Sequence, residues 1–170
     1  VIDMHGILDI TVEQWERVMA VNVRGVMLCH QAAARQMVKQ GKGGKLIATC
    51  SLSGYRPSGK CPAYCCSKWA VRGFTQSCAI ELGQYGITVN SFCPGSVFTN
   101  ISKQFASRLG KEQGVQDPEE MFKQSSHRNN ALNRTLTEED MSGLVSFLAS
   151  KNADAITGQS ILCDGGKSLL

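Results

Sequence analysis

The sequence lacks the long apolar segments that cross membranes. No run of about eighteen apolar residues occurs in the 170-residue chain, so we expect no membrane span and no membrane partner. No signal peptide is recognisable, although the chain begins with Val1 and not with methionine. We therefore expect a cytoplasmic protein.

Disulfide and metal-binding patterns are missing as well. The eight cysteines form no CxxC pair and no Cys/His cluster with zinc spacing, so no metal site is expected. Most of them lie in apolar runs, where a free thiol behaves as a small buried hydrophobe. We expect a reducing, intracellular compartment without disulfides. The cysteines are Cys29, Cys50, Cys61, Cys65, Cys66, Cys78, Cys93 and Cys163.

A block of like charge is also absent. The net charge is +4, and the basic residues are scattered along the chain. Lys39, Lys42 and Lys45 come nearest to a cluster, and three glycines separate them. This pattern is typical of a solvated loop after a helix, so we expect no nucleic-acid partner.

What the chain does contain is typical of one α/β domain. Apolar residues make up 42% and charged residues 19% of the sequence, which is enough to bury a core. Helical and strand patterns alternate, and this order indicates a Rossmann-like, doubly wound parallel sheet with helices on both faces. The expected helices are about Thr11–Val38, Ala63–Leu82 after Pro62, and one that begins after the N-cap Thr137. The expected strands are Lys45–Ser51, Ile87–Phe92 and the segment 158–166.

Residues of about 100–134 interrupt this alternation. The stretch is polar, carries few large apolar residues and has only two weak helical patterns, about Ile101–Leu109 and Pro118–Ser125. Such segments are commonly mobile and functional. We interpret it as a lid-like excursion.

A tyrosine and a lysine lie one helical turn apart in the segment "CPAYCCSKWAVRGFTQ". Tyr64 and Lys68 share a helix face, but such a pair arises by chance in about one such sequence in six. The alternative is a surface tyrosine lying along a lysine side chain. The carboxyl ends of parallel strands meet at one edge of a sheet, where ligands bind. Because Ser51, Pro94 and the start of the Tyr64 helix all fall at that edge, we expect a hydroxyl, a phenol and an ammonium to converge there.

This trio suits proton transfer to a carbonyl or alcohol oxygen. A phenol titrates near pH 10, too high for catalysis at neutral pH. A cation about 6 Å away is worth roughly 2.8 kcal/mol at an effective dielectric constant near 20, which is about two pKa units. Lys68 is therefore expected to lower the pKa of Tyr64, which becomes a general acid/base, while Ser51 holds the same oxygen.

Five ordered motifs resemble those of the short-chain dehydrogenase/reductase family. They extend from about Val1 to Gly166 and match the C-terminal two-thirds of that family. The motifs are "MAVNVRGV", "TCSLSG", "YCCSK", "VNSFCPGSVFT" and "ITGQSILCDGG".

The resemblance implies a role for each matching residue. Tyr64 is the acid/base, Lys68 lowers its pKa and binds the nicotinamide ribose, and Ser51 polarises the substrate oxygen. Asn22 interrupts its helix locally and holds a water that relays protons through Lys68.

The resemblance also implies a nicotinamide-binding turn after the second strand. There the backbone of Val97 binds the nicotinamide carboxamide, and Pro94, Gly95 and Thr99 shape the turn. The excursion after Thr99 is then the substrate lid.

The family's first nucleotide-binding element has no counterpart here. That element is a strand followed by a glycine-rich turn and a helix N-terminus that binds pyrophosphate. Gly41, Gly43 and Gly44 end a helix and do not begin one. We therefore expect residues 1–170 to be one partial Rossmann-fold domain without the N-terminal βαβ portion, and the choice between NAD and NADP to lie outside it.

Three functions are compatible with these motifs. The first is an NAD(P)-dependent oxidoreductase that interconverts a small ketone, a diketone or a similar carbonyl with a secondary alcohol. Several stretches resemble acetoin/diacetyl reductases (butanediol dehydrogenases), although Leu52 departs from the polar residue expected there. Polyol dehydrogenases and acyl-carrier-protein ketoreductases share much of the pattern.

The second function is a truncated, inactive fragment that retains only a subunit-interaction surface. Family resemblance implies a homo-oligomer, a dimer or tetramer, that packs through the helices Thr11–Val38 and Ala63–Leu82. The third function, an epimerase or dehydratase, is disfavoured by the short segment after the last strand.

Overall fold

A parallel three-stranded sheet forms the centre of the structure. The computed structural model describes residues 1–169, including every side chain of these except those of Phe105, Leu109, Glu112 and Gln113. The strand order is β1-β2-β3, and all pairs are parallel, as the sequence predicted. The strands are β1 (Gly44–Thr49), β2 (Ile87–Pro94) and β3 (Ser160–Cys163).

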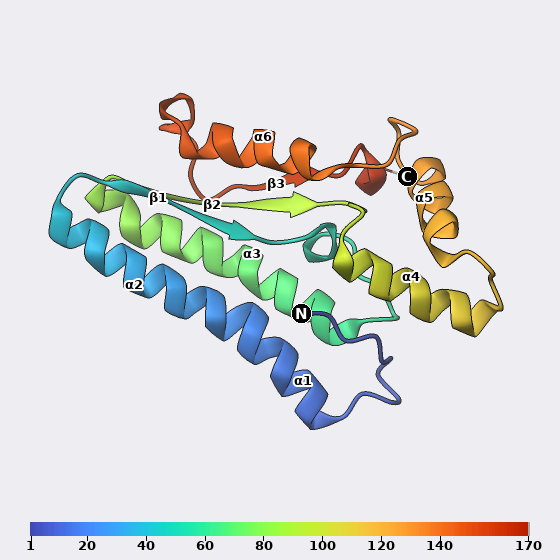
Figure 1. Ribbon diagram of the computed structural model, residues 1–170. Coiled ribbons are helices and arrows are strands. Elements are labelled where there is room, and N and C mark those ends of the chain that lie inside the picture. Colours follow the sequence, from blue (N-terminus) through green and yellow to red (C-terminus); the bar gives the residue numbers. More distant parts are fainter. Residues whose placement is uncertain (170) are drawn as a thin grey trace.

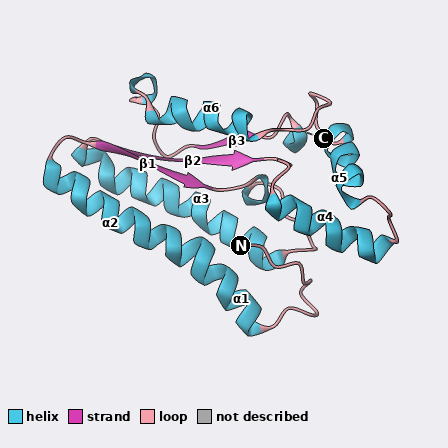
Figure 2. Cartoon of the chain, in the orientation of Figure 1, coloured by secondary structure: helices cyan, strands magenta, loops and turns pink. Residues whose placement is uncertain are grey.

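Helices cover both faces of this sheet, so the doubly wound arrangement is confirmed (Figures 1 and 2). On one face lie α1 (Val12–Met19), α2 (Gly25–Gln40) and α3 (Pro62–Leu82), and on the other lies α6 (Glu138–Ala149). The main buried cluster joins α2 and α3 to β1 and β2. Its members are Ala34, Leu46, Ala79, Leu82, Ile87 and Val89.

The first long helix is broken at Asn22, where the family resemblance implied an interruption. Thr11 caps α1 in a capping box with Gln14, and the helix begins at Val12. Residues Ala20–Arg24 then form a π-helical turn that contains Asn22. Such turns widen a helix locally and occur frequently at functional sites. The helix continues as α2 and ends at Gly41, whose φ of 65° suits a glycine cap.

The excursion between β2 and α6 contains two helices that are both longer than the sequence predicted. They are α4 (Asn100–Gln113) and α5 (Pro118–Arg128). The side chain of Asp117 caps α5 by accepting a hydrogen bond from the Glu120 amide. The rings of Phe98 and Phe122 lie 6.0 Å apart and join α5 to the turn before α4. Motion of this segment as a lid stays a prediction.

Short helical turns complete the chain. They are η2 (Leu52–Gly54), η3 (Gly83–Tyr85), η4 (Lys151–Ala153) and η5 (Lys167–Leu169). All eight cysteines are free. Among the described helices, none has both the length and the apolar character needed to cross a membrane.

Candidate active site

Ser51 lies just beyond the carboxyl end of β1. The strand ends at Thr49, earlier than the predicted boundary at Ser51, because Ser51 caps the following turn. Its hydroxyl oxygen accepts a hydrogen bond of 3.1 Å from the Ser53 amide. This cap fixes Ser51 at the edge of the sheet where β2 also ends.

Tyr64 and Lys68 project from the first two turns of α3. Pro62 begins this helix at a position where its missing N–H costs nothing. Lys68 is buried, with its ammonium 5.5 Å from the centre of the Tyr64 ring. The same ammonium donates a 2.9 Å hydrogen bond to the carbonyl oxygen of Thr49, at the end of β1. Lys68 thereby ties the first turns of α3 to the strand that precedes Ser51.

Most of the predicted site residues line one cavity of about 420 Å³. Asn22 is the exception. The residues that line the cavity are Ser51, Tyr64, Lys68, Pro94, Gly95, Val97 and Thr99. The convergence expected at the carboxyl edge of the sheet is therefore present.

Asn22 lies behind this cavity and contacts α3. Its side-chain nitrogen donates to the Ser67 hydroxyl at 3.0 Å and to the Val1 carbonyl at 2.8 Å. Its side-chain oxygen accepts a 2.8 Å hydrogen bond from the Val1 amino group. Asn22 thus supports the residue next to Lys68, and its water-holding role stays a prediction.

The turn after β2 is held by backbone contacts on both sides. The Gly95 amide donates a 3.1 Å hydrogen bond to the Cys163 carbonyl of β3. A Cβ atom on Gly95 would lie 2.7 Å from the Cα atom of Asp164, so only glycine fits at this position. Val97 then pairs with Leu136 in an isolated parallel bridge. The backbone of this turn is therefore fixed against the cavity.

The pKa of Tyr64 is shifted opposite to the expected direction. Burial raises it above the ordinary value of 10, and nearby Cys50 raises it further, while the Ser51 hydroxyl opposes both. Burial likewise lowers the pKa of Lys68. The net shift is upward because burial of the phenol outweighs the hydrogen bond that lowers the pKa. The lowering expected from Lys68 stays a prediction.

Cys50 is a residue of the cavity that the sequence analysis did not single out. It lies directly before Ser51, is almost fully buried, and its thiol donates to the Lys68 carbonyl at 3.3 Å. A hydrogen bond with Cys93 and, to a smaller extent, the Lys68 charge lower the pKa of Cys50 to about 7, against the effect of burial. Its place beside Ser51 at a strand end was the available signal, but its apolar surroundings made it resemble an inert thiol.

Comparison with known proteins places these residues in a family. A family model described as enoyl-(acyl carrier protein) reductase matches residues 2–168. A short-chain dehydrogenase/reductase from Armillaria gallica is 43% identical over 163 residues, which are 96% of this chain and 60% of that protein. A diacetyl reductase [(S)-acetoin forming] from Staphylococcus aureus is 43% identical over 157 residues, 92% of this chain and 60% of that protein.

Solved structures have the same fold. A gluconate 5-dehydrogenase from Burkholderia cenocepacia, in complex with NADP and tartrate, superposes with a TM-score of 0.85 at 27% identity. The match covers 100% of this chain and 62% of that one. The chain thus spans about three-fifths of the length of the proteins that it matches.

Proposed function

The chain belongs to the short-chain dehydrogenase/reductase family, and on that premise we propose that the protein carrying it is an NAD(P)-dependent oxidoreductase. Its substrates are a small ketone, diketone or similar carbonyl compound and the matching secondary alcohol. The single observation that carries this proposal is the placement of Tyr64, Lys68 and Ser51 around one cavity at the carboxyl edge of the sheet. The relative named as a diacetyl reductase supports this substrate class.

The polar groups of the cavity fit the nicotinamide end of a dinucleotide. The Lys68 ammonium and the Thr99 hydroxyl offer donors for ribose and amide oxygens, and the rigid turn at Gly95 lets the backbone of Val97 approach closely. The bound dinucleotide supplies the hydride in reduction and accepts it in oxidation. Either NAD or NADP is compatible with these residues.

The side chains of the chain itself manage the proton. During carbonyl reduction, the Tyr64 hydroxyl donates its proton to the carbonyl oxygen, and Ser51 donates a hydrogen bond to the same atom. Lys68 stabilises the phenolate that remains, because its ammonium is held near the ring by the Thr49 carbonyl. During alcohol oxidation the same phenolate accepts the proton.

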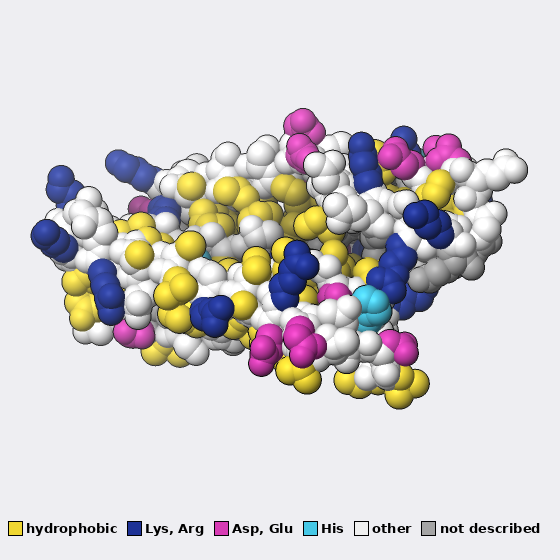
Figure 3. All heavy atoms as spheres, turned by 60° about the horizontal axis from the view of Figure 1, so that its bottom comes forward, with side chains coloured by type: hydrophobic (Ala, Val, Ile, Leu, Met, Phe, Trp, Pro, Cys, Tyr) yellow, Lys and Arg dark blue, Asp and Glu magenta, His cyan; other side chains and the backbone are white. Residues whose placement is uncertain are grey.

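Self-association is part of the same proposal. Hydrophobic side chains are spread over the face formed by α1, α2 and α3 (Figure 3). Exposed apolar side chains on these helices include those of Leu28, Trp69 and Ile80. An apolar helical face of this kind suits burial against a second copy of the chain.

Replacement of the phenol tests the proposed chemistry. Tyr64→Phe removes only the hydroxyl, so turnover should fall by about 10²–10⁴-fold while the protein still binds the cofactor. The measurement is steady-state reduction of a panel of ketones, diketones and sugars with NADH and NADPH, with cofactor fluorescence titration alongside. Tyr85→Phe, at an exposed tyrosine far from the cavity, is the matched control.

Three outcomes separate the alternatives. Near-parental turnover by the Tyr64→Phe variant at neutral pH would refute the acid/base role. Loss of turnover with cofactor binding retained supports the proposal. If neither cofactor quenches fluorescence or shifts the melting temperature of the 170-residue chain, that chain is an inactive fragment that keeps only an interaction surface.

A further inference from the structure

A second cavity of about 600 Å³ opens next to the first. The two share Ser51, Pro94, Gly95 and Ser96, so a molecule whose carbonyl lies at Ser51 would extend into the second cavity. Its walls come from the loop after η2, from α5 and from the segment after β3. These are elements that the proton-transfer chemistry does not use.

Positive charge dominates the lining of this second cavity. Arg56, Arg128 and Lys167 line it, while the lining includes no aspartate or glutamate. Elsewhere in the described part of the chain, Lys45 forms an ion pair with Asp154 and Arg134 with Asp140. None of the three around the cavity takes part in such a pair within the described residues.

Lys167 and Arg56 approach each other at the rim. A guanidinium nitrogen of Arg56 donates a 3.0 Å hydrogen bond to the Lys167 carbonyl, and the Lys167 ammonium donates to the Ser96 hydroxyl at 2.7 Å. Burial and the charge of Arg56 lower the pKa of Lys167, and Asp164 only partly opposes them. The Asp164 carboxylate already accepts hydrogen bonds from the backbone amides of Gly166 and Ser168. An anion in the cavity would relieve this repulsion.

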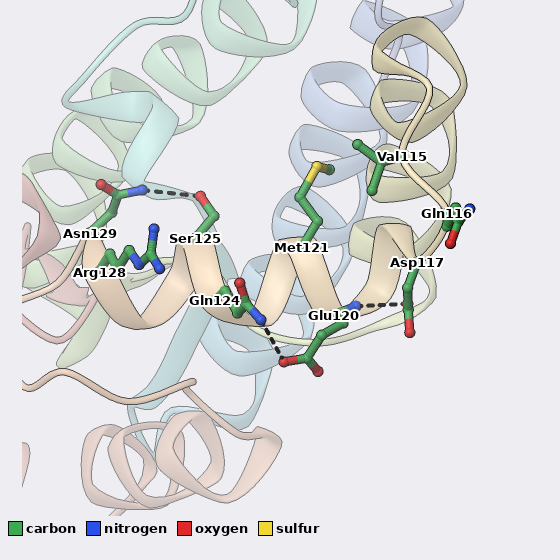
Figure 4. A pocket seen from close by; sticks show the side chains of 9 residues that line it. All are labelled: Val115, Gln116, Asp117, Glu120, Met121, Gln124, Ser125, Arg128 and Asn129. Atoms are coloured by element: carbon green, nitrogen blue, oxygen red, sulfur yellow. Dashed lines mark hydrogen bonds between the residues drawn. The ribbon is translucent and has the colours of Figure 1, made fainter.

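Arg128 approaches the cavity from α5. In Figure 4, Arg128 lies beside Ser125 and Asn129 at one end of that helix, while Asp117 and Glu120 lie at the other. The pocket drawn in Figure 4 and the second cavity are both lined by Ser125, Arg128 and Asn129. Within the described residues, no hydrogen bond or ion pair holds the guanidinium of Arg128. It is therefore free to bind a ligand without breaking a structural contact.

We propose that the substrate carries a carboxylate or phosphate group, which Arg56, Arg128 and Lys167 bind while the carbonyl lies at Ser51. The inference rests on the proposed function, because it names the substrate class of the same site. Guanidinium groups bind carboxylate and phosphate oxygens through paired hydrogen bonds, and the serine hydroxyls of this cavity add further donors. A neutral diketone would provide no negatively charged group for these cations.

Matched pairs of ketones test this substrate class. The pairs are dihydroxyacetone with its phosphate, and 4-oxopentanoate with its methyl ester, assayed with NADH and NADPH. At least one anionic member should have a kcat/KM at least 10-fold above that of its neutral partner, mainly through a lower KM. The pair that shows the preference distinguishes a phosphate ligand from a carboxylate.

Replacement of Arg128 connects the preference to the cavity. Arg128→Gln should reduce the preference for the anion at least 10-fold, with the fold intact because the guanidinium makes no hydrogen bond or ion pair to the part of the chain that the structure describes. Lys42→Gln removes one exposed charge outside the cavity and should leave the preference unchanged. Equal preference in the parent and the Arg128→Gln variant would overturn the proposal.

Binding separates this proposal from the proposed function. Isothermal titration with dihydroxyacetone phosphate and with 4-oxopentanoate measures affinity without turnover. Anion binding that falls in the Arg128→Gln variant, with no ketone reduced at all, would support the anion site and contradict the proposed function. Turnover of neutral ketones with no gain from an anionic group would overturn the anion site alone.

Discussion

Tyr64 and Lys68 each lie where burial disfavours the charged form. The phenol has its pKa raised and the amine has its pKa lowered, so both are driven toward neutrality. The amine donates to the Thr49 carbonyl and lies 5.5 Å from the centre of the Tyr64 ring. Cys50, which also lines the cavity, is one of the groups that raise the pKa of Tyr64 further.

Removal of the Cys50 thiol should shift the pH dependence of catalysis. The pKa of Cys50 is lowered to about 7, and a negative charge on its thiol raises the pKa of Tyr64. Cys50→Ala should therefore move the rising limb of kcat/KM for alcohol oxidation to lower pH. The measurement is the full pH profile of that parameter.

Cys66→Ala is the matched control, because Cys66 is exposed on α3, the helix that carries Tyr64. Its profile should coincide with that of the parent. A limb that stays in place in Cys50→Ala, or moves to higher pH, would contradict the electrostatic role of Cys50.

The individual residues of the site differ in how far the sequence predicts them. Tyr64, Lys68 and Ser51 were predictable because chain spacing and the strand ends place them together. Cys50 was not, because its pKa depends on Cys93, which lies on the neighbouring strand. The same holds for the cations of the second cavity, which come from elements far apart in the chain.

At the scale of elements, α2 and α3 pack through a buried histidine. The His30 ring meets Phe74 edge-on, with ring centres 5.8 Å apart. One ring nitrogen, Nε2, is buried without a hydrogen-bond partner among the described residues. A neutral imidazole tolerates this position better than a charged one.

This packing predicts that acid destabilises the fold through His30. Burial lowers its pKa below the ordinary 6.5, only partly opposed by a hydrogen bond with the Val26 backbone. The stability that His30 contributes is fully present above pH 6.5 and is lost as the pH falls through the lowered pKa. The thermal midpoint should therefore drop on acidification below pH 6.5, and less steeply in His30→Gln.

Thermal melts between about pH 7.5 and 5 measure this difference, over the range in which histidines titrate. His127→Gln, at an exposed histidine on α5, is the control. If the His30→Gln and parental proteins lose equal stability on acidification, another group carries the effect.

The order of elements was predictable, while several of their ends were not. Alternating apolar strands and capped helices fixed the α/β arrangement, and Asn22 correctly marked the interrupted helix. The end of β1 was misplaced because Ser51 has the extended backbone of a strand residue, while its side chain accepts a hydrogen bond from the Ser53 amide and caps the next turn. The lengths of α4 and α5 were underestimated because polar helices carry little apolar periodicity.

At the scale of the whole molecule, the candidate active site and the apolar face of α1, α2 and α3 lie on different parts of the structure. The cavity residues lie at the carboxyl edge of the sheet, while the face of α1, α2 and α3 is available to a partner (Figures 1 and 3). Within the described residues, β1 and β3 each pair with β2 only, so both edges of the sheet carry unpaired backbone groups. The separation means that association can be weakened without touching the site.

Substitution of one exposed apolar residue of α3 by lysine tests the proposed self-association. The Ile80 side chain is 86% exposed on α3, and a charge buried there against a second copy would have no partner. Ile80→Lys should weaken association by at least about 10-fold, because burial of an unpaired charge is costly. Light scattering after size-exclusion chromatography would show the mass fall toward that of one copy.

Leu132→Lys, at a 61% exposed position between α5 and α6, is the control and should keep the parental mass. An unchanged mass in Ile80→Lys would place the interface elsewhere on the molecule.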